Sequence, residues 1–83
     1  MTADEFAREL NARIEKAAAS GLPYVDVTAR DLHRAVGGYP GPNHRMPTCC
    51  EVMRRFIQRG DEVLGEPPRG RGASLTIRYR LPR

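Results

Sequence analysis

The sequence lacks any long hydrophobic run. No stretch of its 83 residues approaches the roughly 20 apolar residues that a helix needs to span a bilayer. The N-terminal segment also lacks the apolar core of a signal peptide and has the pattern of a polar helix instead. We therefore expect a cytoplasmic protein with no membrane partner.

Cysteine is scarce, and its arrangement excludes a disulfide framework. The two cysteines, Cys49 and Cys50, are adjacent and cannot join distant segments. Zinc binding would need paired ligands at short spacings, which these thiols do not form with His33 and His44. We expect two reduced, buried and inert thiols, with no metal and no cofactor.

Catalytic motifs are also missing. Neither histidine has a serine or cysteine partner at a recognisable spacing, and no pair of buried carboxylates is evident. The Gly-Arg-Gly stretch at 70–72 does not follow a strand and precede a helix, as a phosphate-binding loop would. The sequence therefore predicts a protein that is not an enzyme and has no small-molecule substrate.

Lysine is almost absent, because 13 of the 14 basic residues are arginines. Arginine suits bidentate contacts with phosphate and guanine, although a bias in coding composition would also produce this excess. The net charge of +4 is unevenly distributed: residues 1–28 carry −2, residues 29–59 carry +4 and residues 60–83 carry +2. The basic charge is concentrated in the last two thirds of the chain.

Caps and apolar repeats predict two helices in the first half of the chain. The first covers 3–19, begins with a capping box formed by Thr2 and Glu5, and ends before Ser20-Gly21. Thr28, with Asp31, begins the second helix, and Gly37-Gly38 ends it. The expected inward positions are Phe6, Leu10, Ile14 and Ala17 in the first helix and Ala29, Leu32, Ala35 and Val36 in the second.

A third helix is predicted over 48–59, after a loop over 37–47 that is rich in glycine and proline. Thr48 and Glu51 have the spacing of a capping box, and Gly60 follows the last helical position. The expected inward arc consists of Cys49, Cys50, Val52, Met53, Phe56 and Ile57. The opposite arc is polar and mostly basic, so the helix is sharply amphipathic.

Three short strands complete the predicted domain. One covers Tyr24 to Val27, and another begins at Glu62 and leads into a loop over 65–73. The last segment alternates, with Leu75, Ile77, Tyr79 and Leu81 on the side expected to be buried. We therefore expect one α+β domain over 1–83, in the order helix, strand, helix, helix, strand, loop, strand, with a small antiparallel sheet.

This order and three sequence segments resemble the winged helix-turn-helix superfamily of DNA-binding proteins. VTARDLHRAVGG is similar to the first helix of the helix-turn-helix, TCCEVMRRFIQRG to the recognition helix and EVLGEPPRGRGASLTIRYRL to the wing hairpin. The resemblance covers nearly the whole chain. It departs at the turn between the second and third helices, which is usually a few residues, whereas here 11 residues intervene.

The resemblance implies that helix 48–59 enters the major groove and that the wing, 65–73, touches the backbone or the minor groove. The residues it places on DNA are Arg45, Thr48, Glu51, Arg54, Arg55, Gln58, Arg59, Arg69 and Arg71. Alternatively, Glu51 and Arg55 form an exposed pair on a solvated helix face. The wing is then a plain flexible loop, and Arg45 belongs to an ordinary loop cap.

The function implied by the resemblance is sequence-preferring binding of double-stranded DNA, as a transcriptional regulator or a DNA-targeting module. Winged helices also serve as protein adaptors, so a subunit of a larger assembly is the alternative. A homodimer or a larger protein partner remains open. Affinity that falls steeply with salt distinguishes DNA binding from an adaptor that uses apolar contacts.

Overall fold

A computed structural model describes residues 2–42 and 44–83; Met1 and Asn43, the latter in the predicted loop 37–47, lie outside the described residues. The elements are α1 (Ala3–Ala19), β1 (Tyr24–Thr28), α2 (Ala29–Val36), α3 (Met46–Arg55), β2 (Glu62–Gly65) and β3 (Thr76–Arg80). Both strand pairs are antiparallel, and the sheet order is β1-β3-β2. The predicted α+β class and element order are confirmed.

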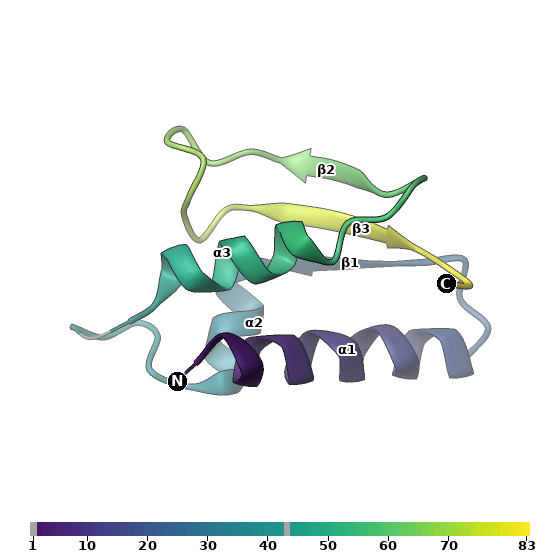
Figure 1. Cartoon of the computed structure of the whole chain (residues 1–83), viewed down its shortest axis with the longest axis horizontal. Coiled ribbons are helices and arrows are strands. Elements are labelled where there is room, and N and C mark those ends of the chain that lie inside the picture. The colour runs from purple at the N-terminus through teal and green to yellow at the C-terminus, as the bar shows by residue number, and fades with distance from the viewer. Residues whose placement is uncertain (1, 43) are drawn as a thin grey trace.

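The first helix, α1, has the predicted bounds and cap. The hydroxyl oxygen of Thr2 accepts a hydrogen bond from the backbone N–H of Glu5 at 3.3 Å, which satisfies one of the free N–H groups of the first turn. The buried residues of the helix are Phe6, Leu10, Ile14 and Ala17. This stripe faces the core that the helices form with one side of the sheet (Figure 1).

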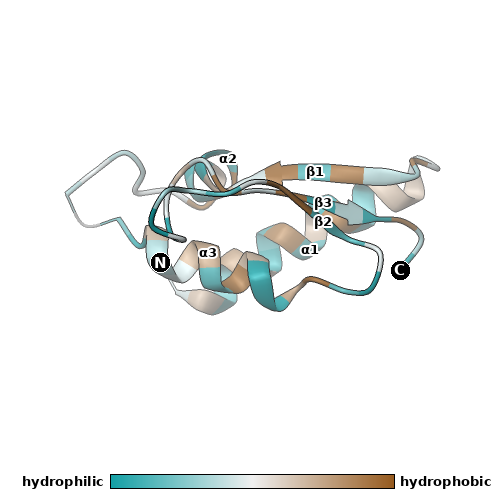
Figure 2. Ribbon diagram, turned by 90° about the horizontal axis from the view of Figure 1, so that it is seen from above, coloured by the Kyte–Doolittle hydropathy of each residue, from teal (hydrophilic) through white to brown (hydrophobic). Residues whose placement is uncertain are grey.

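The central strand is β3, which pairs with β1 on one side and β2 on the other. Ile77 lies opposite both Val27 and Val63, and the predicted inward residues Leu75, Ile77, Tyr79 and Leu81 are all buried. β1 shows the same alternation between hydrophobic and hydrophilic residues in Figure 2. The strand β2 differs, because Val63 and Leu64 are both exposed. The edge strand β2 therefore contributes no buried side chain to the core.

Helix α2 begins as predicted, with the Thr28 hydroxyl accepting from the Asp31 N–H at 3.2 Å. Its inward stripe was predicted incorrectly at Ala35, which is exposed, while His33 is completely buried. The Nε2 atom of His33 accepts a hydrogen bond of 2.9 Å from the backbone N–H of Arg45. The ring also packs edge-on against Phe6, with centroids 4.9 Å apart. The histidine thus links α2 to the start of α3.

Helix α3 begins two residues before the predicted start. Arg45 is its N-cap without a side-chain hydrogen bond, and Pro47 lies in the first turn, where a missing N–H costs nothing. The predicted capping box of Thr48 and Glu51 is therefore wrong, because both residues already lie inside the helix. Thr48 is half-buried.

Helix α3 also ends at Arg55, four residues before the predicted end. Phe56 is its C-cap and packs against the core while only partly buried, whereas Ile57 is 37% exposed, so the predicted inward arc holds as far as Phe56 and is wrong at Ile57. Gln58 and Arg59 lie beyond the helix. Figure 2 shows the last turn of the helix as strongly hydrophilic.

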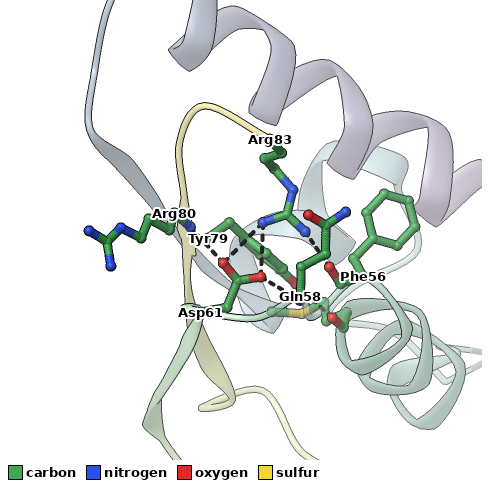
Figure 3. A network of polar contacts seen from close by, with 7 residues as sticks. Phe56, Gln58, Asp61, Tyr79, Arg80 and Arg83 are labelled. Carbon is green, nitrogen blue, oxygen red and sulfur yellow. Dashed lines mark hydrogen bonds and ion pairs between the residues drawn. The ribbon is translucent and has the colours of Figure 1, made fainter.

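The early end of α3 is explained by the carboxylate of Asp61 (Figure 3). It accepts hydrogen bonds from the backbone N–H groups of Gln58, at 2.8 Å, and Arg80, at 2.7 Å, and forms an ion pair of 2.9 Å with Arg83. Arg83 also donates to the backbone carbonyl of Phe56. The backbone N–H of Gln58 and the carbonyl of Phe56, which could otherwise take part in further helical hydrogen bonds, are therefore satisfied by Asp61 and Arg83.

This network is shielded from solvent, since the side chains of Asp61 and Arg83 are 1% and 10% exposed. Burial alone would raise the pKa of the Asp61 carboxyl, but the backbone N–H groups and the Arg83 guanidinium outweigh it and lower this pKa below its usual value. Beside it, the hydroxyl of Tyr79 donates to the Met53 carbonyl at 2.8 Å. The end of α3 is thus fastened to β3.

Candidate nucleic-acid interface

The wing, residues 65–73 between β2 and β3, lies against α3. The backbone N–H of Gly72 donates to the sulfur of Cys50 at 3.4 Å, and the same thiol lies 3.4 Å from the Gly72 carbonyl oxygen. The Cys50 side chain is buried, and burial raises its pKa, so it remains a neutral thiol at neutral pH. Cys50 therefore serves as a contact between the helix and the wing.

Arg54 also holds the wing. Its Nη2 atom donates to the Gly70 carbonyl at 2.7 Å and forms an ion pair with the carboxylate of Glu66. Gly70 has a φ of 77°, which only glycine adopts readily, so its carbonyl is presented to Arg54 by a conformation that a side chain would strain. The structure gives the Arg54 guanidinium two intramolecular partners, Glu66 near the start of the wing and Gly70 at its tip.

Glu51 and Arg71 form a second and looser bridge between helix and wing. Their charged atoms are 3.6 Å apart, and both side chains are more than half exposed. An exposed pair of this kind contributes about 0 to 1 kcal/mol and exchanges partners easily. The sequence suggested Arg55 as the partner of Glu51, but the structure pairs Glu51 with the wing instead. Arg71 is therefore available to an external anion at little cost.

The tip of the wing is a tight turn that presents Arg69. The Gly70 N–H donates to the Pro67 carbonyl at 2.9 Å, which closes a four-residue turn. Proline at its second position, Pro68, and glycine at its fourth suit a type I turn. Arg69 is exposed at the third position. The wing is thus ordered by its own turn and by three contacts with α3.

The other predicted site residues lie elsewhere on the molecule. Arg55 and Gln58 line a hollow of about 470 Å³ between α1, the end of α3 and the residues that follow β3, on a different side of α3 from the wing. Arg59 is exposed in the turn before β2. Arg45 is exposed at the N-terminal end of α3, about one turn before Thr48 and about two turns before Glu51. The structure therefore brings together Glu51, Arg54, Arg69 and Arg71, and separates them from Arg55, Gln58 and Arg59.

No protein-family model, curated protein or solved structure matches this chain.

The geometry adds one basic residue that the sequence did not suggest as a site residue. The backbone N–H of Arg30, in the first turn of α2, donates to the Ala73 carbonyl of the wing at 3.1 Å. Arg30 is exposed and lies next to Arg69 and Arg71 around one hollow. The sequence carries no local indication of this contact, because residues 30 and 73 meet only through the tertiary fold.

Over 2–42 and 44–83, no three His, Cys, Asp or Glu side chains gather in an arrangement that could hold a metal ion. Among the same residues, no helix has both the length and the apolar character needed to cross a bilayer.

Proposed function

We propose that the chain is a winged helix-turn-helix domain that binds double-stranded DNA with a preference for sequence. The order of its elements and the sheet order β1-β3-β2 support this assignment, since they place a hairpin beside a helix with an exposed polar side. A role as a transcriptional regulator or as a DNA-targeting module follows from such binding.

The observation that carries the proposal is the attachment of the wing to α3. Cys50 and Arg54 hold Gly72 and Gly70, so the exposed Arg69 and Arg71 stand in a fixed position relative to the outer side of the helix. Prepositioned arginines lose less conformational freedom when they bind phosphate. A flexible loop would offer the same charges without this advantage.

The roles within the surface follow from where each side chain lies. We assign base contacts in the major groove to Thr48 and Glu51, in the first turns of α3, and to Arg55, which is exposed at the last residue of the helix beside the hollow next to α1. We assign phosphate contacts to Arg45, at the start of the helix, and to Arg59, beyond its end. Arg54 positions the wing, and Gln58 reaches DNA only from the turn that follows the helix.

A protein adaptor is the second candidate, and one feature favours it. Leu22 and Tyr24 are 50% and 42% exposed beside β1, which is an edge strand of the sheet. Next to them, a hollow of about 260 Å³ is lined partly by Ala17, Val25 and Val27. An exposed edge strand with apolar neighbours is a common site for pairing with another chain.

Salt dependence separates the two functions. With the four phosphate contacts of Arg45, Arg59, Arg69 and Arg71, affinity for duplex DNA should fall about 150-fold between roughly 50 and 200 mM salt, because bound cations are released. We would measure this by fluorescence anisotropy with a pool of random duplexes. An adaptor would show no comparable affinity for DNA at either concentration.

A further inference from the structure

The first turn of α2 lies directly against the returning limb of the wing. The N–H groups of Ala29 and Arg30 donate to the carbonyls of Leu75, at 2.8 Å, and Ala73, at 3.1 Å. These bonds use two of the N–H groups that a helix leaves free at its start. They also fix the backbone from which the Arg30 side chain extends, so Arg30 has a defined position relative to the wing.

An open hollow of about 430 Å³ lies between this turn and the wing. Its lining residues are Arg30, Pro67, Pro68, Arg69, Arg71, Gly72, Ala73 and Ser74. Three of them are arginines and none is acidic. The two limbs of the wing come close next to the turn at its tip, since a Cβ on Gly72 would lie 3.2 Å from the Cβ of Pro67. The wall of the hollow is therefore compact, and every charged residue that lines it is an arginine.

The charges around this hollow are poorly neutralised by the protein. In the part of the chain that the structure describes, Arg30 and Arg69 form no ion pair, and Arg71 has only its loose bridge to Glu51. The nearby carboxylate of Glu66 is engaged by Arg54. Three like charges around one hollow repel one another, and an anion placed among them relieves that repulsion.

We propose that this arginine hollow binds a backbone phosphate of double-stranded DNA, with Arg30 of α2 acting together with Arg69 and Arg71 of the wing. The planar guanidinium groups suit the oxygens of a phosphodiester. This inference rests on the proposed function and makes it more specific, because it places the wing on the sugar-phosphate backbone rather than inside the minor groove.

The test compares Arg30→Gln with Arg8→Gln, which removes the same charge from an exposed position on α1. Figure 1 shows α1 on the far side of the molecule from the wing. Binding to a preferred and a scrambled duplex would be followed by fluorescence anisotropy over a salt series, with circular dichroism as a check on the fold. For Arg30→Gln we expect the slope of log affinity against log salt to flatten by about 0.9, which corresponds to roughly an eightfold loss of affinity at ~0.1 M salt.

A phosphate contact predicts the same loss on both duplexes, a wild-type slope for Arg8→Gln and a largely restored slope for Arg30→Lys. If Arg30→Gln keeps the steep wild-type slope, the hollow does not bind phosphate, although DNA binding by the rest of the surface stands. A loss confined to the preferred duplex would make Arg30 a base contact and overturn the assignment. If the wild-type protein itself shows no salt-dependent binding, the proposed function and this inference fail together.

Discussion

The guanidinium of Arg54 donates a hydrogen bond of 2.7 Å to the carbonyl of Gly70, which joins the outer side of α3 to the tip of the wing. The next residue, Arg55, extends instead into the hollow beside α1. A helix wheel places these two arginines on the same polar arc, where they look equivalent. In the folded chain one of them organises the wing, and the other is free to contact a ligand.

The two arginines should therefore respond differently to truncation. Arg54→Ala should increase hydrogen exchange at the Gly72 N–H by roughly tenfold, since a hydrogen bond to a charged group contributes on the order of 1.5 kcal/mol. Arg55→Ala should leave this exchange unchanged, weaken binding to a preferred duplex and relax its sequence preference. Native-state exchange followed by NMR measures the first effect. Equal exchange in both variants would mean that Arg54 does not hold the wing.

Truncation to alanine should destabilise the domain to different degrees at Ile77, Phe56 and Ile57. Ile77 is completely buried, so Ile77→Ala should lower the free energy of unfolding by about 2 to 5 kcal/mol. Phe56→Ala should cost less than a typical core phenylalanine, because the ring is only partly buried. Ile57→Ala should cost the least of the three, about 1 kcal/mol, because the residue is 37% exposed. Urea unfolding provides the three values, and a large effect at Ile57 would contradict the observed end of α3.

The Asp61 carboxylate should make the free energy of unfolding depend on pH in acidic solution. The pKa of its carboxyl is lower in the folded than in the unfolded chain, so its contribution is complete above the usual value of about 4 and disappears as pH falls through the folded value. Asp61→Asn should cost about 1 to 3 kcal/mol near neutral pH, because buried N–H partners lose their charged acceptor. The difference from wild type should shrink steadily towards pH ~3.

Asp26→Asn is the matched control for this experiment. Its carboxyl also has a lowered pKa, through the hydrogen bond from Arg78, but the pair is exposed on the sheet surface. We expect a much smaller loss of stability there. A pH-independent difference between wild type and Asp61→Asn would show that the Asp61 carboxylate is not what stabilises the turn after α3.

The cysteines should be unreactive and free of metal in the native protein. Both are buried, and burial raises the pKa of the Cys49 thiol to about 12, so almost no thiolate exists near neutral pH. Alkylation at pH ~8 should be slow in buffer and fast in denaturant, and elemental analysis should find no stoichiometric zinc. Rapid native labelling, or a chelator that unfolds the protein, would contradict this.

The parts of the fold that the sequence predicted well are those governed by neighbours in the chain. Helix α1 combines an apolar repeat with a cap three residues away, and β3 alternates strictly from Leu75 to Leu81, so both were predicted with the right faces. The end of α3 depends on Asp61 and Arg83, which reach back to the helix from outside it. Periodicity alone continues the helix through Ile57, because it contains no information about these partners.

The same difference between local sequence patterns and contacts made only in the folded chain applies to the candidate site. The sequence could identify an arginine-rich helix and wing, but contacts between them depend on how the hairpin folds back. Three of the contacts join residues that are distant in the sequence: Arg54 with Gly70, Glu51 with Arg71, and Arg30 with the wing. Likewise, a histidine in a helix is usually interpreted as polar, and the burial of His33 is explained by contacts from outside its helix, the hydrogen bond from the Arg45 N–H and the packing against Phe6.

The most direct test of the account is the salt dependence of DNA binding when the two arginines of the wing are removed. For Arg69→Ala combined with Arg71→Ala, affinity for a preferred and a scrambled duplex would be measured against wild type by fluorescence anisotropy over a salt series. The account predicts a nearly equal loss on both duplexes, retained sequence preference and a slope of log affinity against log salt that flattens by up to ~2. An unchanged slope would place the wing away from DNA, and a wild-type protein that binds no duplex would favour the adaptor function instead.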